Sequence, residues 1–355
     1  MNIQSFSWAL AVPAALIATT ASLAASSPPS GKTLEALVES REIPVTLDNF
    51  VRAATDIEFD KYVSLAGGIN RLYHFRDLTP VEHQTTISMN RDTLYSAAIV
   101  DISEGATLTL PDVGERYMSA MVVNQDHYIN AIFHGGGVYQ LDMATFDTPY
   151  VSVYVRTLVN ANDPADVAAV NAIQDRMKIE AVSAKPFVPP VYDEASYAGL
   201  VRAALGFAPF LPDSTRMFGA RDEVSPVRHL IGTAAGWGGL PESEALYVSV
   251  DPEMPIGEYR IEVPTDVPVG SFWSVSLYNA DRYFVPNPLG AYVVNSVSGQ
   301  RNPDGSMTIH LGGCEDGRAN CLPLVEGWQY TVRLYQPGPE VLDGSWSFPA
   351  VQPMN

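Results

Sequence analysis

Residues 124–128, NQDHY, place an acid and an imidazole next to each other directly after an apolar, strand-like segment. Asp126 beside His127 could supply a general base with an orienting carboxylate, or part of a metal site. Asn124 and Tyr128 flank the pair and are candidate ligand-binding residues. The same stretch could instead be a turn whose Asn and Asp side chains cap the backbone. The spacing leaves both interpretations open.

A second polar group stands at the start of another apolar strand, in MNRDTLYS at residues 89–96. An arginine can hold a carboxylate or phosphate through parallel hydrogen bonds, so Arg91 is a candidate anion clamp. A salt bridge between Arg91 and Asp92 that pins the strand is the alternative. From these two groups we predict catalytic roles for His127, Asp126, Arg91 and Tyr95, and ligand contacts for Asn90, Asp92, Asn124 and Tyr128.

Two aromatic residues complete the candidate ligand-binding set. Trp237 lies between glycines in GWGG, residues 236–239, and glycines let a ligand or backbone approach closely. Tyr278 belongs to an aromatic-rich hairpin of the kind that binds sugars and ring compounds. The alternatives are an ordinary helix C-terminus for the glycines and core packing for the tyrosine.

Several familiar catalytic motifs are missing from the sequence. There is no G-x-S-x-G elbow, no H-E-x-x-H pair and no P-loop. The glycines at 135–137 follow a strand but open no helix, so they are not a dinucleotide fingerprint. The six histidines are scattered. We therefore expect no cofactor and no metal site.

The two cysteines, Cys314 and Cys321, lie between strand-like segments. Their C-x6-C spacing does not match zinc sites, and in an oxidising compartment such a pair forms a disulfide. We predict that they are bonded to each other.

The N-terminal segment predicts export. Residues 8–18 are almost wholly apolar, and Ser22 and Ala24 supply the small residues of a signal-peptidase site, so we predict a signal peptide at residues 1–24. No Lys or Arg precedes Lys32, which departs from the usual pattern. A membrane anchor is the alternative, but Pro13 and polar residues interrupt the apolar run. The predicted location is periplasmic or secreted.

The net charge of −19 argues against nucleic acid and anionic membrane surfaces as partners, since both attract basic patches. The expected partner is a small-molecule or oligosaccharide ligand, with no membrane association after signal cleavage. The sequence leaves homo-oligomerisation open.

Hydrophobic periodicity divides the chain into five parts. After the signal peptide, residues 25–61 form a tail and short helices. Residues 62–162 contain six segments with period two, which is typical of a β-sandwich. Residues 163–240 are predicted to be a helical insert, with helices over 165–181, 194–205 and 226–235. Residues 241–355 return to strands, as a second sandwich or jelly roll. The predicted fold class is mainly β with a helical insert.

The chain resembles the bacterial exported proteins that pair domains of unknown function 1254 (N-terminal) and 1214 (C-terminal). The resemblance rests on MNRDTLYS (89–96), VNQDHY (123–128), VRTLV and DPADVAAVNAIQD (155–175), RHLIGTAAGWGG (228–239), FWSVSLYNADRYF (272–284) and RLYQPGPEVLDGSW (333–346). It implies an immunoglobulin-like N-terminal domain, a helical portion and a jelly-roll-like C-terminal domain, and it implies no activity. Gln125 departs from the related motif, in which an acidic residue is expected.

Two functions remain in view. The first is an exported enzyme that acts on a small or oligomeric substrate by hydrolysis or elimination, at a cleft between the domains. The second is a non-catalytic protein that binds a carbohydrate or an aromatic ligand through its aromatic hairpins. Ionisable side chains within hydrogen-bond reach in a cleft would favour the first.

Overall fold

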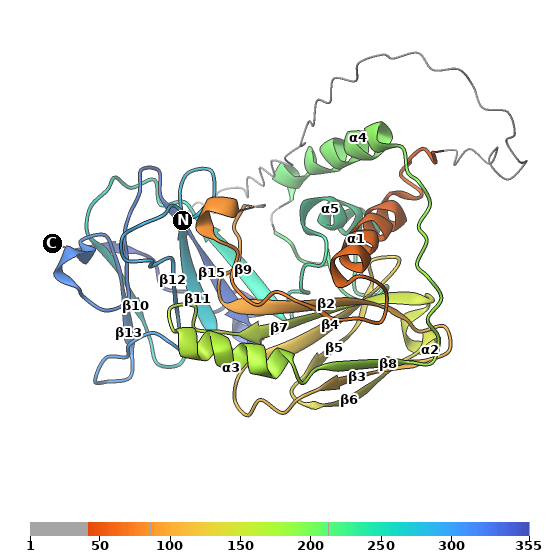
Figure 1. The fold of residues 1–355 in the computed structure, drawn as a ribbon. Helices are drawn as coiled ribbons and strands as arrows, with labels where there is room; N and C mark the ends of the chain where they lie inside the picture. The colour runs from red at the N-terminus through yellow and green to blue at the C-terminus, as the bar shows by residue number, and fades with distance from the viewer. Residues whose placement is uncertain (1–41, 85–86, 212, 355) are drawn as a thin grey trace, which may run out of the picture.

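The computed structural model of this chain describes residues 42–84, 87–211 and 213–354. The predicted signal peptide and the first part of the N-terminal tail lie outside these ranges. Across the described ranges, no helix combines the length and apolarity that a bilayer crossing requires. Figure 1 shows two groups of sheets side by side, with a layer of helices above the N-terminal group.

The N-terminal group consists of two antiparallel sheets that pack face to face. A five-stranded sheet, which we call the central sheet, has the order β1-β2-β7-β4-β5, and a three-stranded sheet has the order β6-β3-β8. Their strands are β1 (Tyr73–His74), β2 (Thr93–Asp101), β3 (Ala106–Leu110), β4 (Met118–Asn124), β5 (Ile129–His134), β6 (Gly137–Leu141), β7 (Tyr150–Leu158) and β8 (Lys178–Ala181). Figure 1 shows the smaller sheet beneath the larger one, and both contribute apolar side chains to one core.

The C-terminal group is a second pair of four-stranded sheets, with orders β12-β11-β15-β9 and β14-β13-β10-β16. Their strands are β9 (Ala245–Val250), β10 (Tyr259–Val263), β11 (Trp273–Tyr278), β12 (Val293–Asn295), β13 (Met307–Leu311), β14 (Cys321–Leu322), β15 (Gln329–Tyr335) and β16 (Gln352–Pro353). All pairings are antiparallel except β13 with β14. Trp273, Ile309 and Val332 belong to the apolar core between the two sheets.

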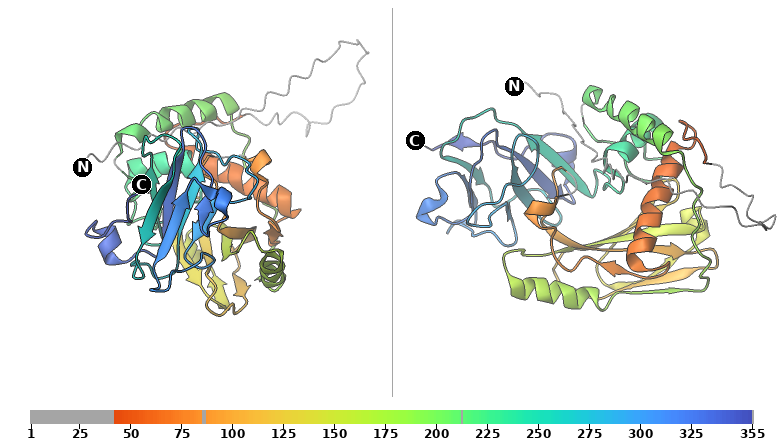
Figure 2. Two further views of the ribbon diagram at one scale, coloured as in Figure 1. Left: turned by 90° about the vertical axis from the view of Figure 1, so that its left-hand side faces the viewer. Right: turned by 45° about the horizontal axis from the view of Figure 1, so that its top comes forward.

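Three helices cover the central sheet on the side away from the three-stranded sheet. They are α1 (Phe50–Ala66), α4 (Glu194–Leu205) and α5 (Pro226–Gly236). Both views in Figure 2 show α4 as the outermost of the three. The remaining helices are α2 (Met143–Phe146), α3 (Pro164–Gln174), α6 (Pro339–Leu342) and the 3-10 turns η2 (Val81–His83), η3 (Ala208–Phe210) and η4 (Cys314–Asp316).

Local sequence accounts for most of these boundaries. Asp163 and Asp193 each accept a backbone hydrogen bond at a helix start, and proline occupies the first turn of α3 and α5. Gly67 ends α1 in the left-handed conformation at φ 69°. The six strands predicted between residues 92 and 159 and the helices predicted at 194–205 and 226–235 are confirmed within a few residues.

Two predicted boundaries are wrong. Short helices were expected within residues 25–61, but α1 continues to Ala66, because Phe59 and Tyr62 pack on the central sheet. The helix expected over residues 165–181 ends at Gln174, and β8 follows it. Met177, Ile179 and Ala181 alternate with charged residues and extend the sandwich core, so burial overrides the helical periodicity.

The strands of the central sheet are buried on both faces. On β2, Ala98 and Val100 join the sandwich core, whereas Ala97 and Ile99 contact α1 on the other side. We call this second side the outer face. On β7, Val153 and Val155 point into the core, so Tyr154 and Arg156 stand on the outer face.

Several antiparallel sheets and central helices are thus observed, in agreement with a mainly β fold with a helical portion. The finer assignments, immunoglobulin-like and jelly-roll-like, stay predictions, as do the domain boundaries. The predicted disulfide is present between Cys314 and Cys321, with an S–S distance of 2.01 Å.

We predict that this disulfide contributes about 2–3 kcal/mol to the free energy of unfolding, as expected for a cross-link that closes a short loop. The double substitution Cys314→Ala and Cys321→Ala should lower the urea midpoint accordingly and leave the circular dichroism spectrum unchanged. Thiol labelling of the native, unreduced protein should find no reactive cysteine. An unchanged midpoint, or two labelled thiols, would contradict the prediction.

Candidate functional site

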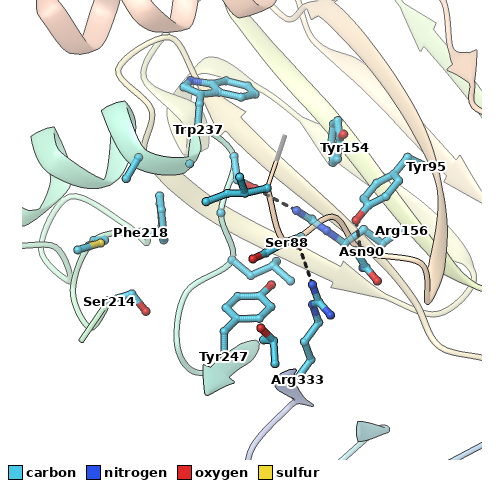
Figure 3. A pocket seen from close by; sticks show the side chains of 18 of the residues that line it. Ser88, Asn90, Tyr95, Tyr154, Arg156, Ser214, Phe218, Trp237, Tyr247 and Arg333 are labelled. Atoms are coloured by element: carbon cyan, nitrogen blue, oxygen red, sulfur yellow. Dashed lines mark hydrogen bonds between the residues drawn. The ribbon is translucent and has the colours of Figure 1, made fainter. Parts of the chain in front are cut away.

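A cavity of about 500 Å³ lies where the outer face of the central sheet meets the C-terminal sheet. Its walls come from α1, β2, β7, the end of α5 and strands β9 and β15. Figure 3 shows these side chains pointing toward a common space. Apolar and aromatic walls are supplied by Ile87, Met217, Phe218, Trp237 and Leu240. Polar groups come from Ser88, Asn90, Arg156, Ser214, Ser249, Arg282, Thr331, Arg333 and four tyrosines, and Glu58 and Lys61 of α1 also line the cavity. The volume lies within the range of small-molecule sites.

Strand register brings the central polar groups together. Tyr95 on β2 is paired with Arg156 on β7, and Ala97 with Tyr154, so these side chains share the outer face. On the C-terminal side Tyr247 on β9 is opposite Arg333 on β15. The alternate residues on β15 belong to the C-terminal core, which turns Arg333 toward the cavity.

Arg156 is the central cation of the site. Its side chain is 7% exposed, and its guanidinium lies 5.2 Å from the ring centroid of Tyr154 and 5.7 Å from that of Tyr95. Nη2 donates to the carbonyl of Gly238 at 3.0 Å, and Nη1 donates to the weakly accepting sulfur of Met121 at 4.0 Å. None of the ion pairs formed by described residues includes Arg156. A buried cation is thus balanced by aromatic rings and a carbonyl rather than by a carboxylate.

Arg156 is surrounded by tyrosines and carries its charge at neutral pH. Burial by itself would lower the pKa of Arg156, but surrounding tyrosine hydroxyls, including those of Tyr95 and Tyr247, raise it by more, so the net pKa is above its ordinary value. Burial raises the pKa of Tyr154 to about 12 and also raises the pKa of Tyr62. The hydroxyls of Tyr62 and Tyr154 lie 3.3 Å apart. At neutral pH these phenols are protonated hydrogen-bond donors.

Arg333 differs from Arg156 because protein groups hold its guanidinium. Nη1 donates to Ser276, and Nη2 donates to the carbonyl of Ser88 and to the hydroxyl of Tyr278. Burial would lower the pKa of Arg333, but Tyr278, Tyr335 and the carboxyl of Asp92 raise it by more. Arg333 therefore adds positive charge to the wall while its geometry is already fixed by these bonds.

Three of the residues predicted from sequence line the cavity: Asn90, Tyr95 and Trp237. The amide nitrogen of Asn90 donates to the hydroxyls of Tyr95 and Tyr335, at 3.1 and 3.0 Å. Trp237 donates from its ring nitrogen to Thr55 on α1. These contacts join the central sheet, the C-terminal sheet and α1 around one space.

The NQDHY stretch forms a turn outside the cavity walls. The side-chain oxygen of Asn124 accepts the backbone N–H groups of Asp126 and Tyr128, as in the capping interpretation. Asp126 forms an ion pair with Arg52 at 2.6 Å. Tyr128 stacks on His229, with ring centroids 4.8 Å apart.

His127 is buried inside this turn, at φ 61°, and is 0% exposed. Nδ1 lies 2.7 Å from the hydroxyl of Thr233, and Nε2 accepts the backbone N–H of Gly238 at 2.9 Å. Burial, with a further contribution from His229, holds the pKa of His127 well below 6.5. The ring is neutral and both nitrogens are occupied by protein groups.

Arg91, Asp92 and Tyr278 also lie outside the main cavity walls. Arg91 stacks over Tyr292 at 5.0 Å and donates to the carbonyl of Thr79. Asp92 is fully buried and accepts from Ser274 at 2.6 Å, and burial raises its pKa. The hydroxyl of Tyr278 donates to the carbonyl of Met89. These contacts connect the N-terminal and C-terminal parts of the molecule. The catalytic role predicted for Arg91 and the ligand contacts predicted for Asp92 and Tyr278 stay predictions.

The sequence analysis overlooked Arg156, Arg333, Tyr154 and Tyr247. A signal was available, because Arg156 and Arg333 each interrupt an otherwise apolar strand, in VSVYVRTLV and TVRLY. A charged residue within a strand buried on both faces needs a polar space or a partner. Among the described residues, no group of three or more His, Cys, Asp or Glu side chains could hold a metal ion.

Comparison with known proteins identifies two family regions. Residues 69–140 match the family model described as Protein of unknown function (DUF1254), and residues 254–339 match Protein of unknown function (DUF1214). The resemblance and its order along the chain are confirmed. No curated protein matches the chain significantly.

Solved structures similar to this one include the following two. The VPA0106 protein from Vibrio parahaemolyticus is 19% identical with a TM-score of 0.65, and the match covers 86% of this chain and 98% of that chain. A putative uncharacterized protein from Burkholderia cenocepacia is 16% identical with a TM-score of 0.46, and the match covers 86% and 87%. The first likeness shows a shared fold, and neither printed name gives an activity.

We predict that buried His127 makes the protein less stable as the pH falls. The unfolded chain takes up a proton at His127 near pH 6.5, whereas the folded protein keeps the ring neutral well below that pH. Its contribution to stability is therefore complete above about pH 6.5 and decreases by up to about 1.4 kcal/mol per pH unit below it.

The measurement is the urea unfolding free energy of wild type and His127→Gln between about pH 7 and pH 5, a window that spans the unfolded-state pKa. The variant lacks the titrating ring but shares every other group, so its stability should fall less steeply. Parallel pH profiles for the two proteins would refute the assignment.

Proposed function

We propose that this chain, in which a DUF1254 region is followed by a DUF1214 region, is an exported protein. It binds a small organic anion in the cavity between its two groups of sheets. The ligand is a carboxylate with an apolar or aromatic body. One observation carries the proposal: Arg156 is a buried guanidinium beside the cavity that has no carboxylate partner among the described residues.

Burial of the Arg156 guanidinium carries an electrostatic cost. An isolated cation removed from water is strongly destabilising unless a counter-charge or hydrogen-bond acceptors replace the water. Two tyrosine rings and the carbonyl of Gly238 supply part of this replacement at Arg156. A ligand carboxylate would supply the rest, and charge-assisted bonds of this kind are the stronger class of hydrogen bond.

The walls support an apolar or aromatic ligand body. Phe218 from the loop before α5 and Trp237 at its C-terminal end lie on the opposite side from the tyrosines of the central sheet (Figure 3), and Leu240 adds a further apolar group to the lining. A flat ring between such walls gains dispersion and edge-to-face contacts. A neutral sugar could use the same walls but would leave Arg156 without a counter-charge, so the carbohydrate alternative has less support.

Binding has more support than hydrolysis or elimination. The cavity walls formed by described residues contain neither histidine nor cysteine. Because the pKa of Tyr154 is raised to about 12, this phenol can donate a hydrogen bond but is a poor base at neutral pH. Glu58 and Lys61 on α1 pair with each other at 3.2 Å. The two enzymatic reactions stay predictions from the sequence.

Export is supported by two features. The first 24 residues have the pattern of a signal peptide. The bond between Cys314 and Cys321 is of a type that persists in oxidising compartments.

We predict that aromatic carboxylates stabilise the purified protein and that Arg156 is responsible. Benzoate, phenylacetate and 3-phenylpropionate should raise the melting temperature, and their amides should not. Calorimetric titration of Arg156→Met should show affinity for the best carboxylate reduced roughly 10- to 100-fold, which corresponds to loss of a hydrogen bond to a charged group.

Arg156→Lys should be intermediate, because lysine keeps the charge but lacks the planar fork. Arg260→Gln is the matched control, since Arg260 pairs with Glu262 on β10, away from the cavity. It should bind as wild type does. The proposal fails if no carboxylate of the panel binds, or if folded Arg156→Met binds as tightly as wild type.

A further inference from the structure

Both ring nitrogens of His127 have defined partners, and these fix its tautomer. The hydroxyl of Thr233 donates to the carbonyl of His229 at 2.8 Å, so its oxygen accepts from Nδ1 of His127. Nε2 accepts the N–H of Gly238 and cannot carry a proton itself. His127 is therefore a neutral imidazole with its hydrogen on Nδ1.

Gly238 connects His127 to the cavity wall through hydrogen bonds at both its N–H and its carbonyl. Its N–H is held by His127 at 2.9 Å, and its carbonyl accepts Nη2 of Arg156 at 3.0 Å. The residue has φ 74°, a conformation that favours glycine. Gly238 thus donates one hydrogen bond to the buried turn and accepts another from the cation in the cavity wall.

Aromatic stacking holds the same segment in place. The ring of His127 lies parallel to Trp237, with centroids 5.2 Å apart and an interplanar angle of 16°. The ring also stacks with His229, with centroids 5.3 Å apart. Trp237 is bonded in turn to Thr55 on α1. The segment before Gly238 is therefore fixed relative to the central sheet, the helix layer and the NQDHY turn.

We infer that His127 is a positioning residue that acts through Gly238 on Arg156, and this inference rests on the proposed function. With the Gly238 carbonyl fixed, Nη2 is anchored and the guanidinium plane cannot rotate freely. Apart from the N–H of Nη1 directed at the sulfur of Met121, the other N–H groups of Arg156 then present a preset fork to a carboxylate, which reduces the entropy lost on binding. His127 itself does not contact the ligand.

Two substitutions separate the contacts of the ring. In His127→Gln, the side-chain oxygen reaches the position of Nε2 and can still accept from Gly238. In His127→Asn, the shorter amide reaches the position of Nδ1 and keeps Thr233 but loses Gly238. Asparagine also tolerates the positive φ of residue 127. The probe is benzoate, or whichever aromatic carboxylate of the panel binds most tightly, titrated calorimetrically.

We expect His127→Asn to weaken binding of the carboxylate roughly three- to tenfold and His127→Gln to change it less than about twofold, as for residues coupled through a shared contact. The decisive measurement repeats His127→Asn in an Arg156→Lys background. A lysine ammonium has no plane for the Gly238 carbonyl to orient, so the additional loss there should be less than about twofold.

The outcomes are distinguishable. An equal loss in the wild-type and Arg156→Lys backgrounds means that His127 supports the fold in general, and it overturns the positioning role. Unchanged affinity in folded His127→Asn overturns it as well, while the proposed function stands. If wild type binds no carboxylate of the panel, the proposed function and the positioning role both fail.

Discussion

Burial of the central sheet on both faces is the constraint on which the rest of the structure depends. One face of β2, β4 and β7 packs against the three-stranded sheet, and the outer face presents further apolar groups such as Ile99 and Met121. That face must be covered, because exposed apolar area of this size is unfavourable in water. Helices α1 and α5 cover one part, and the C-terminal sheet covers another. The cavity lies where α1 and the end of α5 meet the C-terminal sheet.

The chemistry of the cavity follows from the two surfaces that meet there. Each contributes an arginine from the middle of a strand, but the two arginines have different surroundings. Arg333 is held by four protein acceptors and lies near the buried carboxyl of Asp92. Arg156 contacts aromatic rings, one carbonyl and the sulfur of Met121. This asymmetry makes Arg333 part of the joint between the sheets, and it is the reason we propose Arg156 as the group that recognises an anion.

The turn at residues 124–128 shows how residues typical of catalysis can serve geometry instead. Asp126 is paired with Arg52 on α1, and His127 is closed in by Trp237 and His229. The turn therefore connects the end of β4 to both helices that cover the outer face. A neutral imidazole suits this buried turn, because it offers one hydrogen-bond donor and one acceptor at fixed positions.

The sequence by itself determined the elements and the disulfide, because period two, caps and prolines act over a few residues and C-x6-C pairs within one loop. It failed locally at residues 177–181, where burial against the sandwich outweighs helical periodicity. It brought Asn90, Tyr95 and Trp237 into the candidate site but missed Arg156. Only the tertiary structure decided which side of each strand is covered, and by what. Whether a charged residue in a strand is a structural or a binding group depends on this covering, because neighbours distant in sequence set the free-energy cost of burying the charge.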